Sequence, residues 1–208
     1  QEELPFVMED WLAYHLDYIG FDHGEIYDID GSFAEALEPW AKSNVLRSST
    51  VTYHKQWPKQ LSSALEALSK TQPYCTENFA YAHCLTRHNA LSRWVALLHA
   101  PDEYVNLHKN RYPGALKEVM AYLESDLPEH QVFAFFQVNG VSLARGGMGA
   151  EEENAGRGAV VAASKIRMPM PYHHMPLVDP FNCLAAGPHM CYREVGDAHQ
   201  WSGITKEV

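Results

Sequence analysis

The sequence predicts an α/β fold with a mostly parallel central sheet and helices on both faces of that sheet. Two short apolar runs, residues 93–99 (RWVALLH) and 131–138 (QVFAFFQV), have the length and composition of strands that are buried on both sides. Segments with helical periodicity lie before and between these runs, an alternation typical of layered α/β proteins. The chain has 208 residues, 46% of them hydrophobic, which predicts a single domain over residues 1–208.

The N-terminal part begins with a helix, a strand and a second helix. Residues 9–19 repeat apolar side chains at helical spacing, and Gly20 offers this helix a C-terminal stop. Residues 24–30 (GEIYDID) predict a short strand followed by an acidic turn. Ser32, with Glu35 three positions later, has the pattern of a capping box that opens the next helix.

Further elements continue the alternation along the chain. Residues 51–54 predict a short strand, and residues 62–69, 75–92 and 114–123 predict helices. Together with the two apolar runs, they complete the pattern on which the α/β prediction rests.

Two later segments show no packing period. Glycine and glutamate dominate residues 144–163, which we expect to form a flexible loop or a partly disordered segment. Residues 167–180 contain four prolines, which predict an extended, irregular path over the surface.

The charge of the chain limits its partners. The formal net charge is −10, so the chain repels polyanions and nucleic acid is not expected as its main partner. An acidic protein can still bind a nucleotide by placing a divalent cation between its carboxylates and the phosphates.

Hydropathy and cysteine content bear on the compartment. No apolar stretch approaches the roughly 20 residues that span a bilayer, and no signal-like segment opens the chain at Gln1-Glu2-Glu3. We expect a chain without a membrane span, either soluble or released from a leader or anchor. Four cysteines allow two disulfides in three pairings, and they leave the compartment open.

Acidic residues follow two of the predicted strands. Asp28 and Asp30 end the first strand, and Asp102 and Glu103 lie beyond the first apolar run. Ligands of open α/β sheets bind beyond the carboxyl ends of strands, so these residues share one rim if the two strands are neighbours in a parallel sheet. Oxygen ligands suit Mg²⁺ or Mn²⁺. The alternative is that these carboxylates are simply solvated.

Other chemistries find less support. Cys84 and His88 would share a helical face, with His83 beside Cys84, but the sequence has no CxxC or HExxH pattern, which favours helix packing by Cys84 over a zinc site. No GxSxG motif marks a nucleophile, and the glycines at 146–149 do not follow a strand as a phosphate loop would. His189 is a candidate phosphate contact, with a plain surface position as the alternative.

Four stretches carry a family resemblance. Residues 9–32 hold an acidic residue, Trp, His, Gly and a strand that ends in Tyr-Asp, and residues 93–107 (RWVALLHAPDEYVNL) resemble an Asp-x-Asp-Glu-Phe strand end. Residues 164–169 (SKIRMP) are similar to a Lys-x-hydrophobic-Arg-Pro element, and residues 191–194 (CYRE) fall where a His-Tyr-Arg element is expected. In this order, the stretches resemble glycosyltransferase family 92 and the related family 2-like glycosyltransferases.

The resemblance implies a GT-A-like layered fold that transfers a sugar from a UDP-sugar donor to a glycan hydroxyl in the secretory pathway, in the Golgi lumen. Asp102 takes the place of the ligand for Mn²⁺ or Mg²⁺, and Glu103 is the candidate catalytic carboxylate. The metal would neutralise the charge that grows on the departing diphosphate. The candidates for substrate binding are Asp28, Asp30, Lys165, Arg167 and His189.

Two positions depart from the family pattern. Ala100 stands where the first aspartate of the motif is expected, and Cys191 stands where the histidine is expected. A metal site with one oxygen fewer stabilises the phosphates less, which lowers the rate by orders of magnitude. Enzymatic activity is therefore left open. The resemblance therefore leaves two expectations: a metal-dependent glycosyltransferase, or a catalytically degenerate glycosyltransferase-like domain that serves as a structural or binding subunit of a larger assembly.

Overall fold

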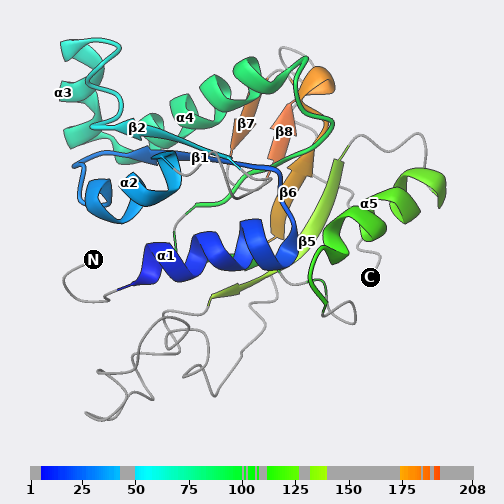
Figure 1. Cartoon of the computed structure of the whole chain (residues 1–208). Coiled ribbons are helices and arrows are strands. Elements are labelled where there is room, and N and C mark those ends of the chain that lie inside the picture. Colours follow the sequence, from blue (N-terminus) through cyan, green and yellow to red (C-terminus); the bar gives the residue numbers. More distant parts are fainter. Residues whose placement is uncertain are drawn as a thin grey trace.

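A computed structural model describes residues 6–42, 50–99, 101, 103–105, 107, 112–126, 132–139, 174–183, 185–187 and 190–192. In these residues helices and strands are mixed, as predicted (Figure 1). The described strands form one four-stranded sheet and two pairs. None of the described helices is long and apolar enough to cross a membrane. The segment predicted to be a loop at 144–163 lies outside the described residues.

The predicted N-terminal helix is confirmed. It consists of α1 (Val7–Leu12), which continues directly into a π-helix, η1 (Ala13–Ile19). Gly20 ends it in the left-handed region, with φ at 98°, and its N–H donates to the carbonyl of His15 over 3.0 Å. A Cβ at Gly20 would lie 3.0 Å from the Cα of Gly114, so the position favours glycine for its conformation and its space.

A parallel pair of strands follows. β1 (His23–Asp28) and β2 (Thr50–Lys55) pair along their full lengths, and α2 (Ala34–Lys42) lies between them in the sequence. α2 packs with α1 on one face of this pair, while α4 (Pro73–His88) lies on the other face (Figure 1). Among the described strands, β1 and β2 therefore form the parallel pair with helices on both faces, which agrees with an α/β fold but not with a mostly parallel central sheet.

The remaining helices also lie near their predicted places. α3 (Ser63–Thr71) is capped by Ser62, whose hydroxyl accepts from the N–H of Leu65 over 3.1 Å. α4 ends at His88, earlier than the predicted end at 92, and α5 (Ala115–Asp126) follows the turn at Gly114.

The four-stranded sheet departs from the prediction. Its order is β3 (Val95–Ala96), β6 (His174–Val178), β5 (Val132–Asn139) and β4 (Glu103–Val105), and all neighbours are antiparallel. Both predicted apolar runs contribute strands to this sheet, but the expectation of mostly parallel pairing is wrong here. The apolar pattern of a strand does not depend on the direction of the neighbouring strand. Here β6 lies between β3 and β5 and is antiparallel to both.

β6 lies within the stretch predicted to be an irregular surface path, and for the described residues 174–178 that prediction is wrong; residues 167–173 lie outside the described residues. Leu177 and Val178 are 1% and 0% exposed. Pro176 pairs with Ala134 of β5, but the pairing of β6 with the short β3 covers only Leu177 and Val178. At Pro176, β6 therefore has one partner strand, and a position of this kind tolerates a residue without an N–H. The chain continues through η2 (Pro180–Asn182) to the antiparallel pair β7 (Ala185–Gly187) and β8 (Met190–Tyr192).

Cysteines divide into two classes. Cys183 is buried and disulfide-bonded, while Cys75 and Cys84 are free. Of the two disulfides that the composition allows, the chain therefore forms at most one within itself.

Candidate functional site

The most prominent polar cluster of the described residues centres on Glu25 in β1. Successive residues of a strand face opposite sides, so Gly24, Ile26 and Asp28 face α1 and α2, while His23, Glu25 and Tyr27 face α4. β2 adds its own alternate residues to the same side. Two short strands thereby direct a line of ionisable side chains at one helix.

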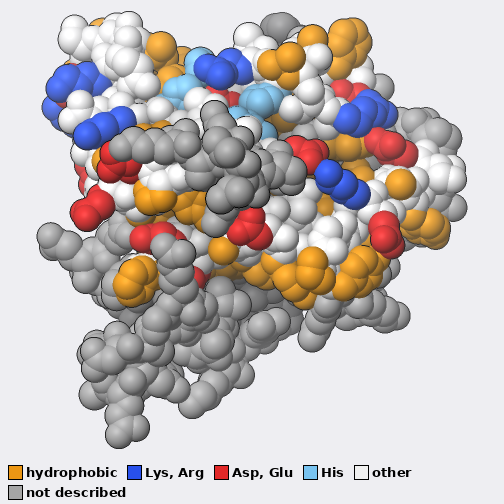
Figure 2. Space-filling model, viewed as in Figure 1, with side chains coloured by type: hydrophobic (Ala, Val, Ile, Leu, Met, Phe, Trp, Pro, Cys, Tyr) orange, Lys and Arg blue, Asp and Glu red, His pale blue; other side chains and the backbone are white. Residues whose placement is uncertain are grey.

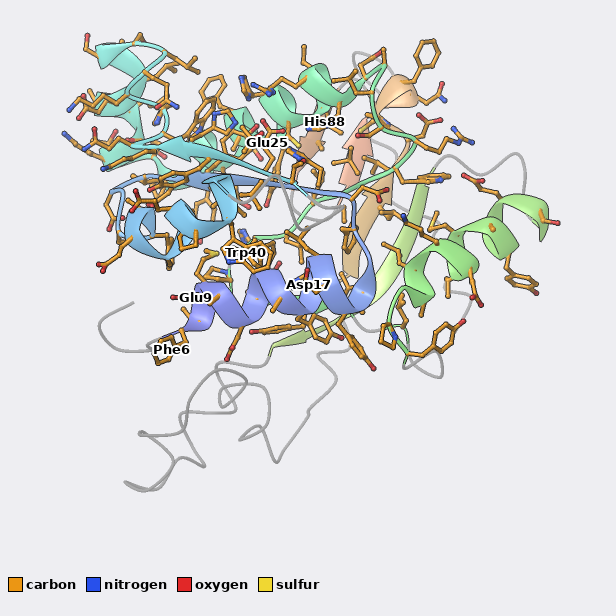
Figure 3. All side chains as sticks on the ribbon, viewed as in Figure 1. Phe6, Glu9, Asp17, Glu25, Trp40 and His88 are labelled. Atoms are coloured by element: carbon orange, nitrogen blue, oxygen red, sulfur yellow. The ribbon has the colours of Figure 1, made fainter. Side chains whose placement is uncertain are left out.

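Both carboxylate oxygens of Glu25 are engaged, and the side chain is 3% exposed. Oε1 accepts from His54 Nε2 over 2.7 Å and lies 3.0 Å from Arg87 Nε, while Oε2 accepts from His88 Nε2 over 2.6 Å. Figure 3 shows Glu25 and His88 next to one another between β1 and α4. This carboxylate is therefore the centre of a charged network contributed by three elements.

Two further imidazoles complete the cluster. The rings of His23 and His88 lie 5.3 Å apart, and those of His54 and His83 lie 5.1 Å apart. Tyr27 stacks on His54 at 4.5 Å. Figure 2 shows histidine side chains gathered at the surface in this region, beside basic side chains, so the cluster is accessible from solvent.

Hydroxyl groups hold the outer ring nitrogens of three of these histidines. His23 Nδ1 lies 2.7 Å from Thr50 Oγ1, and His88 Nδ1 lies 2.8 Å from Ser92 Oγ. His83 Nδ1 lies 2.8 Å from the hydroxyl of Tyr27. Each ring is thus oriented through Nδ1, which leaves Nε2 to face a further partner.

Burial and neighbouring charges shift several pKa values. Burial alone would raise the pKa of Glu25, but hydrogen bonds from His54 and His88 outweigh it and lower the pKa to about 2. Burial, and then the charge of a neighbouring histidine, lowers the pKa of both His23 and His83. Glu25 is therefore ionised at neutral pH, and these two imidazoles are neutral.

Cys84, which the sequence placed beside His88, has a different role. Burial and the charge of Glu25 raise the pKa of its thiol to about 12, so it stays protonated. Its side chain packs against the apolar cluster that contains Leu85 and Val178. This position agrees with the prediction that Cys84 packs the helix rather than binds zinc.

Two groups of side chains within the cluster have the spacing of metal ligands. They are His23, Glu25 and His88, and Glu25, His54 and His83; within each group the ligand atoms lie within 4.8 Å of one another. Imidazole and carboxylate together suit Zn²⁺ and other first-row transition metals.

Asp28, a predicted substrate-binding residue, is 5% exposed and is occupied by its own chain. Its Oδ1 accepts from the N–H of Gly31 over 2.9 Å, and its Oδ2 accepts from the N–H of Phe33 and the hydroxyl of Tyr53 over 3.0 and 2.8 Å. Asp28 therefore holds the turn that leads into α2.

Asp30, the other acidic candidate in this turn, is more exposed. Its Oδ1 accepts from the N–H of Ser32 over 2.9 Å, and this hydrogen bond lowers its pKa. It lies at the carboxyl end of β1, where the sequence placed it.

Glu103 is 6% exposed, and its Oε2 accepts from the N–H of His99 over 2.6 Å. This hydrogen bond closes the turn between β3 and β4. Its backbone carbonyl accepts from the indole of Trp11 over 2.9 Å. Glu103 thus ties the strand end to the N-terminal helix.

The other predicted site residues, Asp102, Lys165, Arg167 and His189, lie outside the described residues, as does Ala100. The strands expected to bring Asp28 and Asp102 to one rim are not neighbours. β1 pairs with β2, and β3 pairs with β6 in another sheet. A shared rim therefore does not follow from strand adjacency.

Sequence reasoning missed Glu25, His23 and His54, and it considered His83 and His88 only beside Cys84. One local signal was present: ionisable side chains recur at every second position from His23 to Tyr27. The partners on α4 are about 60 residues away, and no local pattern connects them to β1.

No protein-family model, no curated protein and no solved structure matches this chain.

Proposed function

We propose that this chain is a glycosyltransferase-like domain that binds a UDP-sugar through a divalent cation at the turn between β3 and β4. One observation carries the proposal. Two stretches on which the family resemblance rests, about 90 residues apart in the sequence, meet in the structure through side chains of the N-terminal helix and the backbone of β4.

Three hydrogen bonds make this junction. Trp11 Nε1 donates to the carbonyl of Glu103 over 2.9 Å, and the hydroxyl of Tyr14 donates to the carbonyl of Val105 over 2.7 Å. The N–H of Val105 donates to Nε2 of the buried His15 over 3.2 Å. β4 is the edge strand of its sheet, so the helix takes the place of a neighbouring strand and fixes the backbone directly after position 102.

A fixed backbone at this point serves metal binding. Position 102 directly precedes this held strand in the sequence, and Mg²⁺ and Mn²⁺ need only one or two carboxylate ligands when phosphates supply the others. Because the Glu103 carboxylate bonds to the turn, Asp102 is the proposed metal ligand. We assign the diphosphate to Lys165, Arg167 and His189 on the family resemblance.

A degenerate, non-catalytic version of this domain is the second candidate. The carboxylates of Asp28 and Glu103 are both bound by groups of the chain itself, so neither is presented to a nucleotide. Ala100 supplies no oxygen to the motif. Because these acidic groups are used within the chain, they favour a structural or binding subunit that still binds the UDP-sugar donor but no longer transfers the sugar.

The disulfide at Cys183 supports the secretory pathway as the proposed compartment, because such bonds persist in oxidising lumens and are rare in the cytosol. A glycan acceptor in the Golgi lumen fits that location.

Calorimetry of UDP binding with Mn²⁺ tests the proposal. We expect the native chain to bind UDP only with the metal, and Asp102→Ala to abolish binding. Asp22→Asn, which removes an exposed carboxylate paired with Lys117, is the matched control and should bind normally. If Asp102→Ala binds UDP as the native chain does, the turn between β3 and β4 is not the binding site.

Turnover separates the two candidates. UDP release from a panel of UDP-sugars with glycan acceptors should be little or none for the native chain. Activity that appears in Ala100→Asp would show that the missing aspartate is where transfer was lost. Robust turnover by the native chain would instead establish the active enzyme.

A further inference from the structure

We propose that His23, Glu25 and His88 bind one divalent transition-metal ion of the Zn²⁺ class, at a site separate from the turn between β3 and β4. This site lies between β1 and α4 and does not depend on the glycosyltransferase proposal. Its three ligand atoms lie within 4.8 Å of one another, and they come from two rigid elements.

The two carboxylate oxygens of Glu25 have different surroundings, and this selects the group. Arg87 Nε lies 3.0 Å from Oε1, on the oxygen that also accepts from His54. A guanidinium repels a cation at that oxygen. Oε2 accepts from His88, and the guanidinium contact is to the other oxygen. The ion therefore binds on the Oε2 side, with His23 and His88.

Hydroxyl groups orient the two histidine ligands through their other ring nitrogens. The Nδ1 atoms of His23 and His88 are held by hydroxyls at 2.7 and 2.8 Å, from Thr50 and Ser92. Histidine ligands of metals characteristically have their second ring nitrogen held in this way.

A hydroxyl partner also allows the change of tautomer that metal binding requires. In a neutral His88 without the ion, Nε2–H donates to Glu25, which can only accept, and Nδ1 is then the nitrogen that accepts from the Ser92 hydroxyl 2.8 Å away. With the ion, Nε2 presents its lone pair to the metal, the ring proton is on Nδ1, and Nδ1–H donates to the same Ser92 oxygen. No hydrogen bond of the outer nitrogen is lost.

The ligand set defines the class of ion. Two imidazoles and one carboxylate favour Zn²⁺, Co²⁺, Ni²⁺ and Cu²⁺ over Mg²⁺ and Ca²⁺, which prefer oxygen ligands. Ligand bonds of about 2.0–2.1 Å require the close contact between His88 and Glu25 to open by less than about 1 Å. Three protein ligands leave coordination positions for water or a small ligand.

Titration of the full chain with Zn²⁺ by calorimetry, and with Co²⁺ by visible absorption, tests this site. All proteins in this comparison should carry His173→Gln and His174→Gln, because these two consecutive histidines could bind the metal themselves. We expect one ion per chain, and loss of at least about 10- to 100-fold in affinity for His23→Gln, Glu25→Gln and His88→Gln. Ser92→Ala should weaken binding about 10-fold through its effect on His88.

His83→Gln is the matched control, because it removes an imidazole of the same cluster from the group that we do not select, and it should leave affinity unchanged. A loss of metal affinity in His83→Gln with no loss in His23→Gln would overturn the assignment. Equal metal affinity in all variants would overturn it as well. Far-UV circular dichroism checks that each variant is folded. His23→Gln, at the partly exposed end of β1, decides the question if Glu25→Gln does not fold.

Discussion

Acidification should destabilise this protein through His15, a buried imidazole that the fold keeps neutral. A carbonyl can only accept and an N–H can only donate, so Nδ1–H donates to Trp11 and the bare Nε2 accepts from Val105. Protonation of Nε2 would place an N–H against an N–H and bury a charge. Burial accordingly lowers the pKa of His15 from 6.5 to about 4.

The sign and size of the effect follow from this shift. Between pH 6.5 and pH 4 the unfolded chain binds a proton at His15 that the folded chain does not, so stability falls as the pH falls through this window. Above pH 6.5 both states are neutral and the contribution is flat. The expected loss from His15 between pH 7.5 and pH 5 is about 2 kcal/mol.

Urea unfolding of the native chain and of His15→Gln, at several pH values from 7.5 to 5, measures this loss. Glutamine can donate to Trp11 and accept from Val105 but does not titrate. The variant should be less stable at pH 7.5, by about 1–2 kcal/mol. From pH 7.5 to pH 5 it should lose about 2 kcal/mol less than the native chain, a difference in which other titrating groups cancel. Parallel pH curves for the two proteins would refute the reasoning.

Five other substitutions probe three local features, each by urea unfolding. Asp28→Asn should cost about 2 kcal/mol because an amide replaces one of two accepting oxygens, and Tyr53→Phe, which removes one partner of Asp28, should cost less; the reverse order would contradict this role. Gly20→Ala should cost more than Gly114→Ala, since both have positive φ but only the first Cβ meets backbone at 3.0 Å; equal costs would argue against the close contact. Ser62→Ala should cost about 1 kcal/mol through loss of the cap of α3, and no measurable loss would mean that the cap is not stabilising.

Local signals in the sequence were enough for most helices and for the segments that form the strands β1 and β2. Periodic apolar residues and the stop at Gly20 predicted the N-terminal helix, and the predicted strands at 24–30 and 51–54 correspond to β1 and β2. The helices could be predicted because their hydrogen bonds and caps involve residues within a few positions of one another, and the two strand segments because of their local composition, although their pairing joins His23 to Thr50.

The central sheet and the histidine cluster required the tertiary structure. Proline made 174–178 look irregular, yet burial of Leu177 and Val178 between two other strands makes it a central strand, and strand direction is absent from an apolar pattern. Likewise, the cluster around Glu25 forms only because packing brings Nε2 of His88 on α4 within 2.6 Å of the Glu25 carboxylate. The sequence by itself determined most of the helices and the segments that form β1, β2, β3 and β5, because local patterns specify them. Only the tertiary structure decided that 174–178 is a strand, which strands pair and which side chains meet, because those contacts join residues far apart in the chain.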